Sequence, residues 1–163
     1  MDYPLLPKQL PARIKRVWRK TIVVTSGLLY LFVGLICAIV YLLDIWTSYW
    51  FVAIMSLVGL ISISAIVRWA LVSYRYTFHR YEMTSEDLAF QKGYFFRSTT
   101  IVPINRIQHI DTEQGPFLRK EHLIEMRIHT AATTHRIAGL DSDEAQILRN
   151  QIIEMVKAAK EDV

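Results

Sequence analysis

The chain has 163 residues, of which 52% are apolar, a single cysteine and a formal net charge of +4. One cysteine cannot form a disulfide within the chain, so the sequence carries no sign of an oxidising compartment. The excess positive charge is confined to residues 1–20, since residues 68–163 hold 13 basic and 13 acidic side chains. A nucleic-acid-binding domain normally has a basic surface of its own, so this balance argues against nucleic acid as a partner.

Residues 1–20 are predicted to form a basic juxtamembrane arm. Three prolines interrupt residues 1–11, which we expect to be irregular. The basic side chains that follow lie directly before an apolar run, where Lys and Arg attract anionic lipid headgroups. The sequence therefore predicts a membrane-proximal basic segment, and a topology signal is the favoured interpretation over specific lipid recognition. The residues are Arg13, Lys15, Arg16, Arg19 and Lys20.

Two uncharged runs, residues 21–43 and 45–67, each contain 23 residues without Asp, Glu, Lys or Arg, and only Asp44 separates them. As helices they would each be about 34 Å long, enough to cross a bilayer core of about 30 Å. We predict a two-span transmembrane hairpin over residues 21–72, with the lipid bilayer as one partner. Small residues around Gly59 are expected to pack on the first span near Gly27 and Gly34.

Basic residues predict the orientation of this hairpin. Six of them precede the first span, Arg68, Arg75 and Arg80 follow the second, and the connection has none. By the positive-inside rule both termini are expected to be cytoplasmic in a two-span protein of the cell membrane. Neither span has an ionisable residue at mid-depth, which argues against transport by this chain alone.

Residues 73–163 are predicted to form a cytoplasmic α+β domain. Alternating apolar and polar side chains predict six strands, at residues 73–83, 88–95, 98–104, 107–112, 124–129 and 133–138. Asp141, followed by Glu144, predicts a capped helix start. The helix carries an apolar stripe made of Ala145, Leu148, Ile152, Met155 and Ala159. We expect a bent sheet or small barrel closed by this amphipathic C-terminal helix.

Two polar clusters are candidates for a site. His109, Asp111, His129 and His135 offer ligands for Zn²⁺ or Fe²⁺ and support an alternative function as a metal- or lipid-processing enzyme. The favoured interpretation is a solvated sheet face, with no metal or other cofactor. Because the domain also lacks a glycine-rich phosphate loop and a nucleophilic cysteine, we predict that it is not an enzyme.

The second cluster contains Arg106, Gln108, Asp111 and Gln114, in which Arg106 and Asp111 are close enough in sequence to pair. A structural network that fixes this loop is the favoured explanation, since buried polar groups must be satisfied locally. The candidate binding residues from both clusters are Arg106, Gln108, His109, Asp111, Gln114, Arg127 and His129.

These segments carry a resemblance to a known family. The chain resembles the bacterial pleckstrin-homology-like family and its two-span membrane members. The match rests on Val102-Pro103, Arg106, Gln108-His109, Asp111-Thr112, Gln114-Gly115-Pro116, the run from Arg127 to Ala132 and Gly139-Leu140-Asp141. The resemblance implies a pleckstrin-homology-type split β-barrel with a C-terminal helix, preceded by a two-helix transmembrane hairpin, and supplies no catalytic residues.

The resemblance also implies partners. Its members are similar to subunits of a paired membrane system whose other subunit is a longer relative, so a hetero-oligomer is expected. The family link is to the cell envelope and to tolerance of membrane-active peptides. Eukaryotic domains of this type bind phosphoinositides through a basic first hairpin loop. Here that loop, residues 84–87, is acidic, which argues against headgroup binding by this route.

Overall fold

The structure is a computed structural model that describes residues 5–93 and 97–161. The chain forms two compact units. Trp18–Val72 make up one unit, which we call the hairpin unit, and Met1–Val17 together with Ser73–Val163 make up the other, which we call the sheet unit.

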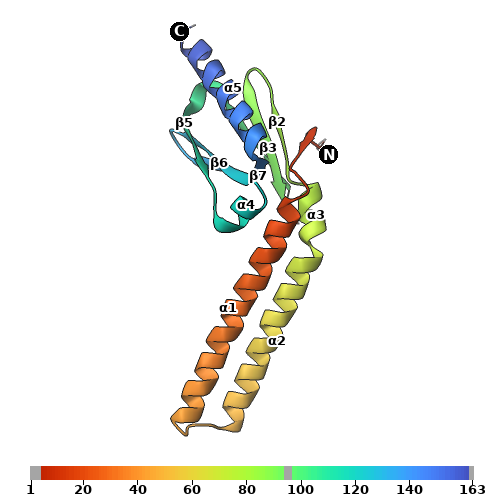
Figure 1. The fold of residues 1–163 in the computed structure, drawn as a ribbon, viewed down its shortest axis with the longest axis vertical. Helices are drawn as coiled ribbons and strands as arrows, with labels where there is room; N and C mark the ends of the chain where they lie inside the picture. The colour runs from red at the N-terminus through yellow and green to blue at the C-terminus, as the bar shows by residue number, and fades with distance from the viewer. Residues whose placement is uncertain (1–4, 94–96, 162–163) are drawn as a thin grey trace. The chain divides into compact units, whose positions relative to one another are not determined.

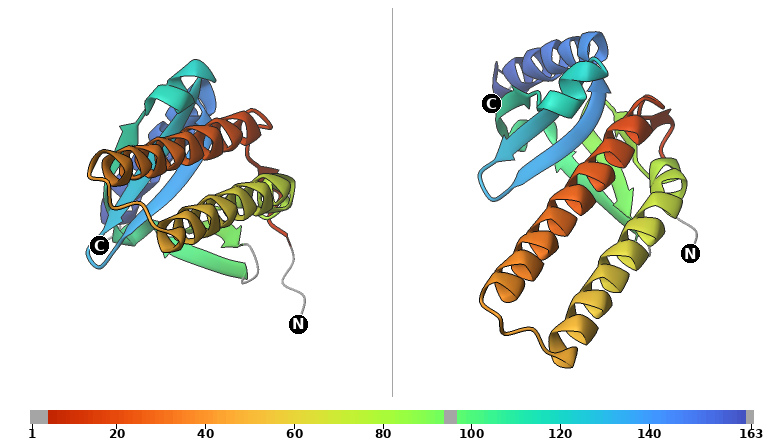
Figure 2. Two further views of the ribbon diagram at one scale, coloured as in Figure 1. Left: turned by 90° about the horizontal axis from the view of Figure 1, so that it is seen from below. Right: turned by 60° about the horizontal axis from the view of Figure 1, so that its bottom comes forward.

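The hairpin unit contains two long helices that run antiparallel and side by side (Figure 1, Figure 2). Helix α1 spans Ile14–Leu42 and helix α2 spans Ser48–Ala70. Both are long and apolar enough to cross a membrane. Asp44 lies in their connection with a positive φ of 56°. The prediction of two apolar helices joined at Asp44 is therefore confirmed, although α1 begins well before the uncharged run.

Glycines do not bring the two helices into close contact. A Cβ atom added at Gly27, Gly34 or Gly59 would meet nothing within 4 Å, so the glycines themselves make no close contact. The expected packing of small α2 residues on this part of α1 is found at Ser62. A polar contact joins the helices instead: the hydroxyl groups of Tyr30 and Ser62 lie 2.8 Å apart. The glycine surfaces of both helices consequently stay open within this unit.

The sheet unit consists of two antiparallel sheets, with strand orders β1-β2-β3-β4 and β5-β6-β7 among the described residues. Helix α5 packs against β6, β7 and the short helix η1. The strands are β1 Lys8–Gln9, β2 Arg80–Met83, β3 Asp87–Gly93, β4 Arg97–Pro103, β5 Ile107–Glu113, β6 Leu123–Thr130 and β7 Thr134–Asp141; the helices are α3 Val72–Thr77, η1 Ile104–Arg106, α4 Pro116–Lys120 and α5 Ser142–Glu161. One four-stranded sheet, one three-stranded sheet and a C-terminal helix form a split barrel, so the predicted fold is confirmed.

The core lies between the sheets and under α5. Met126 and Ile128 alternate with outward-facing residues on β6, as period-two alternation predicts. From α5, the predicted stripe is confirmed at Ala145, Leu148 and Ile152, all buried. Met155 is half-buried, and the side chain of Ala159 lies outside the described residues. So do residues 94 and 95, the predicted end of the strand over 88–95.

The predicted strand over residues 73–83 is wrong in its first half, which forms helix α3, Val72–Thr77. The rings of Tyr74 and Phe78 lie 4.8 Å apart, an i, i+4 aromatic pair on one helical face. The Thr77 hydroxyl donates to the Ser73 carbonyl at 3.2 Å, which is also a helical contact. Aromatic residues at every second position therefore occur in a helix here, and the strand begins only at Arg80.

The N-terminal arm is an integral part of the sheet unit. Lys8 and Gln9 pair with β2 as an added edge strand, so the prediction of an irregular segment is wrong for them. Leu10, Ile14 and Val17 are buried in the core. Ile14 and Val17 are three residues apart at the start of α1 and so share one helical face, while Leu10 lies in the segment before the helix. These three buried side chains hold the arm on the sheets.

Candidate functional site

A β-bulge on β5 determines which side chains face solvent. Ile107 pairs with Thr130, but His109 pairs with His129, so Gln108 is the extra residue. In a regular ladder His109 would lie opposite Ile128 and point into the core. The bulge reverses the alternation, so Ile107 is buried while His109 points outward.

Three of the predicted polar residues meet on this outer face. The rings of His109 and His129 stack with centroids 4.1 Å apart and planes 8° apart. An Asp111 carboxylate oxygen, Oδ2, lies 3.6 Å from Nε2 of His109 and 3.1 Å from Nε2 of His129. Cross-strand pairing and the period of two thus place the three side chains together, and we call them the outer-face cluster.

His135 does not join the outer-face cluster, contrary to the predicted four-residue grouping. It pairs with Ile128, so it lies on the opposite face of the sheet from His129. Its Nε2 is 2.8 Å from the Thr133 hydroxyl, and its ring lies 5.3 Å from that of Phe90. Burial lowers the pKa of His135, and the positive charge of Lys92 lowers it further. Both effects favour the neutral imidazole.

The residues of the second predicted cluster, Arg106, Gln108, Asp111 and Gln114, do not come together. Arg127, a further candidate binding residue, forms ion pairs with Glu113 and Glu125. The Gln114 side-chain amide donates to the Leu123 carbonyl at 3.0 Å and so fixes the loop, as the structural interpretation expected. The expected pairing of Arg106 with Asp111 is absent among the described residues, because the bulge at Gln108 turns Asp111 toward the histidines.

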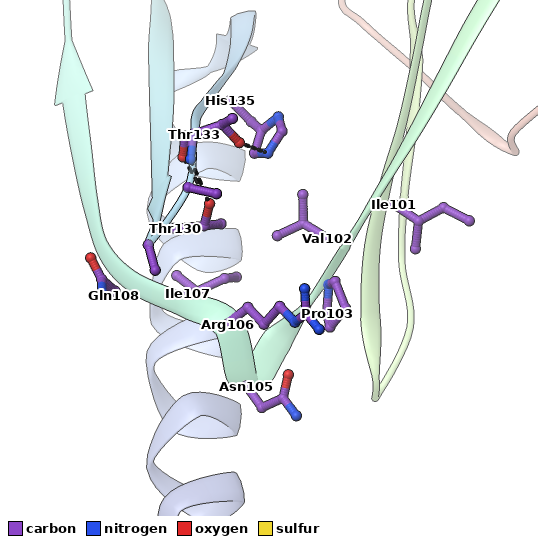
Figure 3. A pocket seen from close by; sticks show the side chains of 12 residues that line it. Ile101, Val102, Pro103, Asn105, Arg106, Ile107, Gln108, Thr130, Thr133 and His135 are labelled. Atoms are coloured by element: carbon purple, nitrogen blue, oxygen red, sulfur yellow. Dashed lines mark hydrogen bonds between the residues drawn. The ribbon is translucent and has the colours of Figure 1, made fainter.

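Arg106 instead lines a cleft of about 690 Å³. The cleft lies between the end of β4, η1 and the start of β5 on one side and the β6–β7 turn on the other (Figure 3). Arg106 is its one fully charged lining residue, and no ion pair of this side chain occurs within the described part of the chain. The lining residues are Ile101, Val102, Pro103, Asn105, Arg106, Ile107, Gln108, Thr130, Ala131, Ala132, Thr133 and His135.

Sequence reasoning missed most of this cleft and found only Arg106 and Gln108 as candidate binding residues. One available signal is the Ala131-Ala132 pair, which lies in a hairpin turn where Gly, Asn, Asp and Ser are usual. A second is Ile101, an apolar side chain on an edge strand with 60% of its surface exposed. Both signals are apolar residues at exposed loop and edge positions.

The predicted membrane-proximal basic residues have protein contacts. Arg13 pairs with Asp141, and Arg16 lies 3.1 Å from the buried carboxylate of Glu121. The Lys15 ammonium lies 4.1 Å from the centre of the Tyr76 ring. In the hairpin unit, the Arg19 guanidinium lies 5.4 Å from the Trp69 ring, and Lys20 also has a contact. Lipid binding by these residues stays a prediction.

Two apolar helices of membrane-spanning length, joined to a split barrel with a C-terminal helix, define a membrane protein with a pleckstrin-homology-like domain. The chain belongs to the bacterial PH domain family, whose model matches residues 10–156. It is 33% identical over 148 residues to the UPF0699 transmembrane protein YdbS of Bacillus subtilis strain 168, and the match covers 91% of each chain. No solved structure gives a significant match.

These matches confirm the family predicted from the sequence motifs. They extend from the N-terminal arm through both apolar helices to α5, so the whole arrangement belongs to the family. The family is one of membrane proteins with a pleckstrin-homology-like domain and is not a known enzyme family.

Proposed function

We propose that this protein is a membrane-anchored binding module and a subunit of a hetero-oligomeric complex in the cell envelope. Its partner is a longer membrane protein of the same family, and the cleft beside β4 receives an extended segment of that partner. The module itself carries out no reaction. A role of the complex in tolerance of membrane-active peptides rests on the family resemblance alone.

The observation that carries this proposal is the position of the cleft between unpaired strand edges. Strands β4 and β5 each have a ladder partner on one side only within the described residues, and η1 connects them at the closed end of the cleft. Unpaired edges offer backbone N–H and C=O groups to an added strand, a common mode of peptide recognition.

The lining of the cleft suits a peptide better than a small polar metabolite. Apolar residues, including Val102, Ile107 and Ala132, line the cleft together with the hydrogen-bonding groups of Asn105 and Thr130. Arg106 adds one positive charge, which favours a segment with an acidic residue or a free carboxylate. Tethering to a membrane also raises the effective concentration of a partner in the same membrane.

We expect Ile101→Glu to reduce recovery of the partner about tenfold, a loss of about 1.4 kcal/mol in binding free energy. Ile101 lies on the face of the sheet opposite Val102, where a strand added at the β4 edge would place a side chain beside it. A carboxylate at this position would lose that apolar contact. The measurement is a quantitative pull-down of the tagged full-length protein from membranes solubilised in mild detergent, with mass spectrometry of the bound proteins.

Ile147→Glu is the matched control, because Ile147 on α5 is apolar and 59% exposed, against 60% for Ile101, and lies outside the cleft. This variant should retain the partner. Gly59→Leu tests a separate contact within the membrane, since open space at Gly59 lets the chain itself accept the larger residue. Equal partner loss in both isoleucine variants, or no enriched partner for wild type, contradicts the proposal.

The proposed topology places both termini and the sheet unit in the cytoplasm. In a Cys37→Ser background, we expect a membrane-impermeant maleimide to label the Ser48→Cys variant in intact cells. The Ser85→Cys variant should react only after permeabilisation. Ser48 and Ser85 are both exposed, so accessibility within the fold does not limit either reaction. Labelling of the Ser85→Cys variant from outside would overturn the orientation expected from the basic residues.

A further inference from the structure

We propose that His109, Asp111 and His129, the outer-face cluster, form a binding site for a zinc-type divalent cation. This site lies on the outer face of β5 and β6, and the proposed binding of a partner segment does not depend on it. One possible ligand atom from each residue lies within 4.8 Å of the other two. The three residues come from two adjacent strands, whose ladder fixes their backbone positions.

The distances fit tetrahedral coordination. Ligand atoms at about 2.0–2.2 Å from a tetrahedral zinc ion are about 3.3–3.6 Å apart. Asp111 Oδ2 lies 3.1 Å from Nε2 of His129 and 3.6 Å from Nε2 of His109. Stacking makes the two imidazole planes nearly parallel, so one ring must turn to direct both lone pairs at a single ion. His109 has room to turn, because 59% of its side chain is exposed.

His129 is already oriented as a ligand. Its Nδ1 lies 3.0 Å from the Thr134 hydroxyl. In the tautomer that carries the proton on Nδ1, the hydroxyl accepts this proton and the Nε2 lone pair is free for a metal ion. Such a partner on the second nitrogen is usual for metal-binding histidines. Nε2 is buried and has no hydrogen bond within the described part of the chain, although Asp111 lies 3.1 Å away. The approach of the carboxylate satisfies the distance of a hydrogen bond without its alignment.

The charge of Asp111 remains available to a cation. Arg127 is its direct cross-strand neighbour and would be expected to neutralise it. However, Arg127 is engaged by the carboxylates of Glu113 and Glu125. Two acidic groups around one arginine leave this part of the sheet with an excess of negative charge. The outer face therefore attracts a cation. The Asp111 carboxylate forms no ion pair with Arg127 within the described part of the chain and can bind that cation.

The ligand set indicates the class of metal. Two imidazoles and one carboxylate suit Zn²⁺ and related transition-metal ions, whereas Mg²⁺ and Ca²⁺ prefer oxygen ligands throughout. Asp111 and His109 have side chains 55% and 59% exposed, so the remaining coordination position is open to water. Three protein ligands with a fourth position open to water distinguish this arrangement from a closed, four-ligand structural zinc site.

The test is zinc binding by the full-length protein in detergent, purified without a histidine tag and stripped with a chelator. After equilibrium dialysis against Zn²⁺, elemental analysis should find one ion per wild-type chain. His129→Ala and Asp111→Asn should lose this ion, and Thr134→Val should raise the dissociation constant about 10- to 100-fold, the usual effect of removing an orienting partner.

His135→Ala is the control, because this histidine lies on the other face of the sheet and should leave zinc binding unchanged. Zinc should also raise the unfolding temperature of wild type but not that of Asp111→Asn, since a ligand stabilises the state that binds it. The proposal fails if wild type retains no more zinc than His129→Ala, or if His135→Ala loses as much as the outer-face variants.

Discussion

Gly139→Ala is expected to destabilise the sheet unit by about 2–6 kcal/mol, from backbone strain and overpacking together. Gly139 is the extra residue of a bulge on β7, since Ile124 pairs with Leu140 and Glu125 with Ala138. Its φ of +101° disfavours any side chain. An added Cβ would also lie 2.5 Å from the δ1 carbon of Ile14, which is buried.

Amide hydrogen exchange of β6 and β7 is the appropriate measurement. All four tryptophans lie in the hairpin unit, so their fluorescence does not report on the sheets. Gly115→Ala is the matched control, because Gly115 has a φ of −69° and open space at the Cβ position. We expect it to cost less than about 1 kcal/mol, the usual penalty for losing a good N-cap residue.

A double-mutant cycle with Ile14→Ala separates the two causes. If the clash contributes, the cost of the double variant should fall below the sum of the single costs by about 0.5–3 kcal/mol. Strain at φ of +101° would remain in the double variant. Additive costs would show that contact with Ile14 contributes nothing, and wild-type exchange in Gly139→Ala would contradict the close packing of the arm.

The spans and most strands could be predicted because each has a local signal. Uninterrupted apolar length identifies α1 and α2, and period-two alternation identifies β6. The helix α3 was missed because Tyr74, Tyr76 and Phe78 satisfy alternation and helical i, i+4 spacing at once. Tertiary contact decides between them: the Tyr76 hydroxyl donates to the Leu10 carbonyl at 2.8 Å.

The docking of the N-terminal arm could not be predicted from its composition. Three prolines and a basic charge suggested an irregular segment, and they obscured the apolar side chains of Leu10, Ile14 and Val17 between them. The receiving site also lacks a sequence signal, because it depends on a bulge glycine and on ion pairs from distant segments. Arg13 and Asp141 are separated by more than a hundred positions, and only the fold brings them together.

The site was predictable only where the ladder preserves sequence spacing. His109 and Asp111 share a face because they are two residues apart on one strand. The partnership with His129 depends on the bulge at Gln108, which shifts the register by one residue. His135 was grouped wrongly for the same reason, since its face follows from pairing with Ile128 rather than from its residue type.

Asp141→Ala is expected to destabilise the sheet unit by about 1–3 kcal/mol, because this carboxylate has two functions. It caps α5, whose first residue is Ser142, by accepting the Asp143 N–H at 3.4 Å. It also pairs with Arg13 of the arm. The predicted capping box also needs Glu144 to accept the Asp141 N–H, and no such hydrogen bond occurs among the described residues. Oε1 of Glu144 instead accepts the Tyr81 hydroxyl proton at 2.5 Å.

The two functions differ in expected size. Loss of an N-cap costs about 0.5–2 kcal/mol. The ion pair is solvent-screened, with side chains 39% and 28% exposed, and such pairs contribute about 0.2–1 kcal/mol. Asp141→Asn keeps a capping oxygen but removes the charge, so it should cost under about 1 kcal/mol if the cap dominates.

Urea titration followed by exchange of α5 amides measures these variants in the full-length protein. A cycle of Asp141→Ala with Arg13→Ala isolates the ion pair, because its coupling energy excludes the hydrogen bond from Arg13 to the Glu121 carbonyl. Asp143→Ala is the control for an exposed acidic residue in the first turn. If Asp141→Ala costs no more than Asp143→Ala, then neither the cap nor the anchor to the arm stabilises the domain.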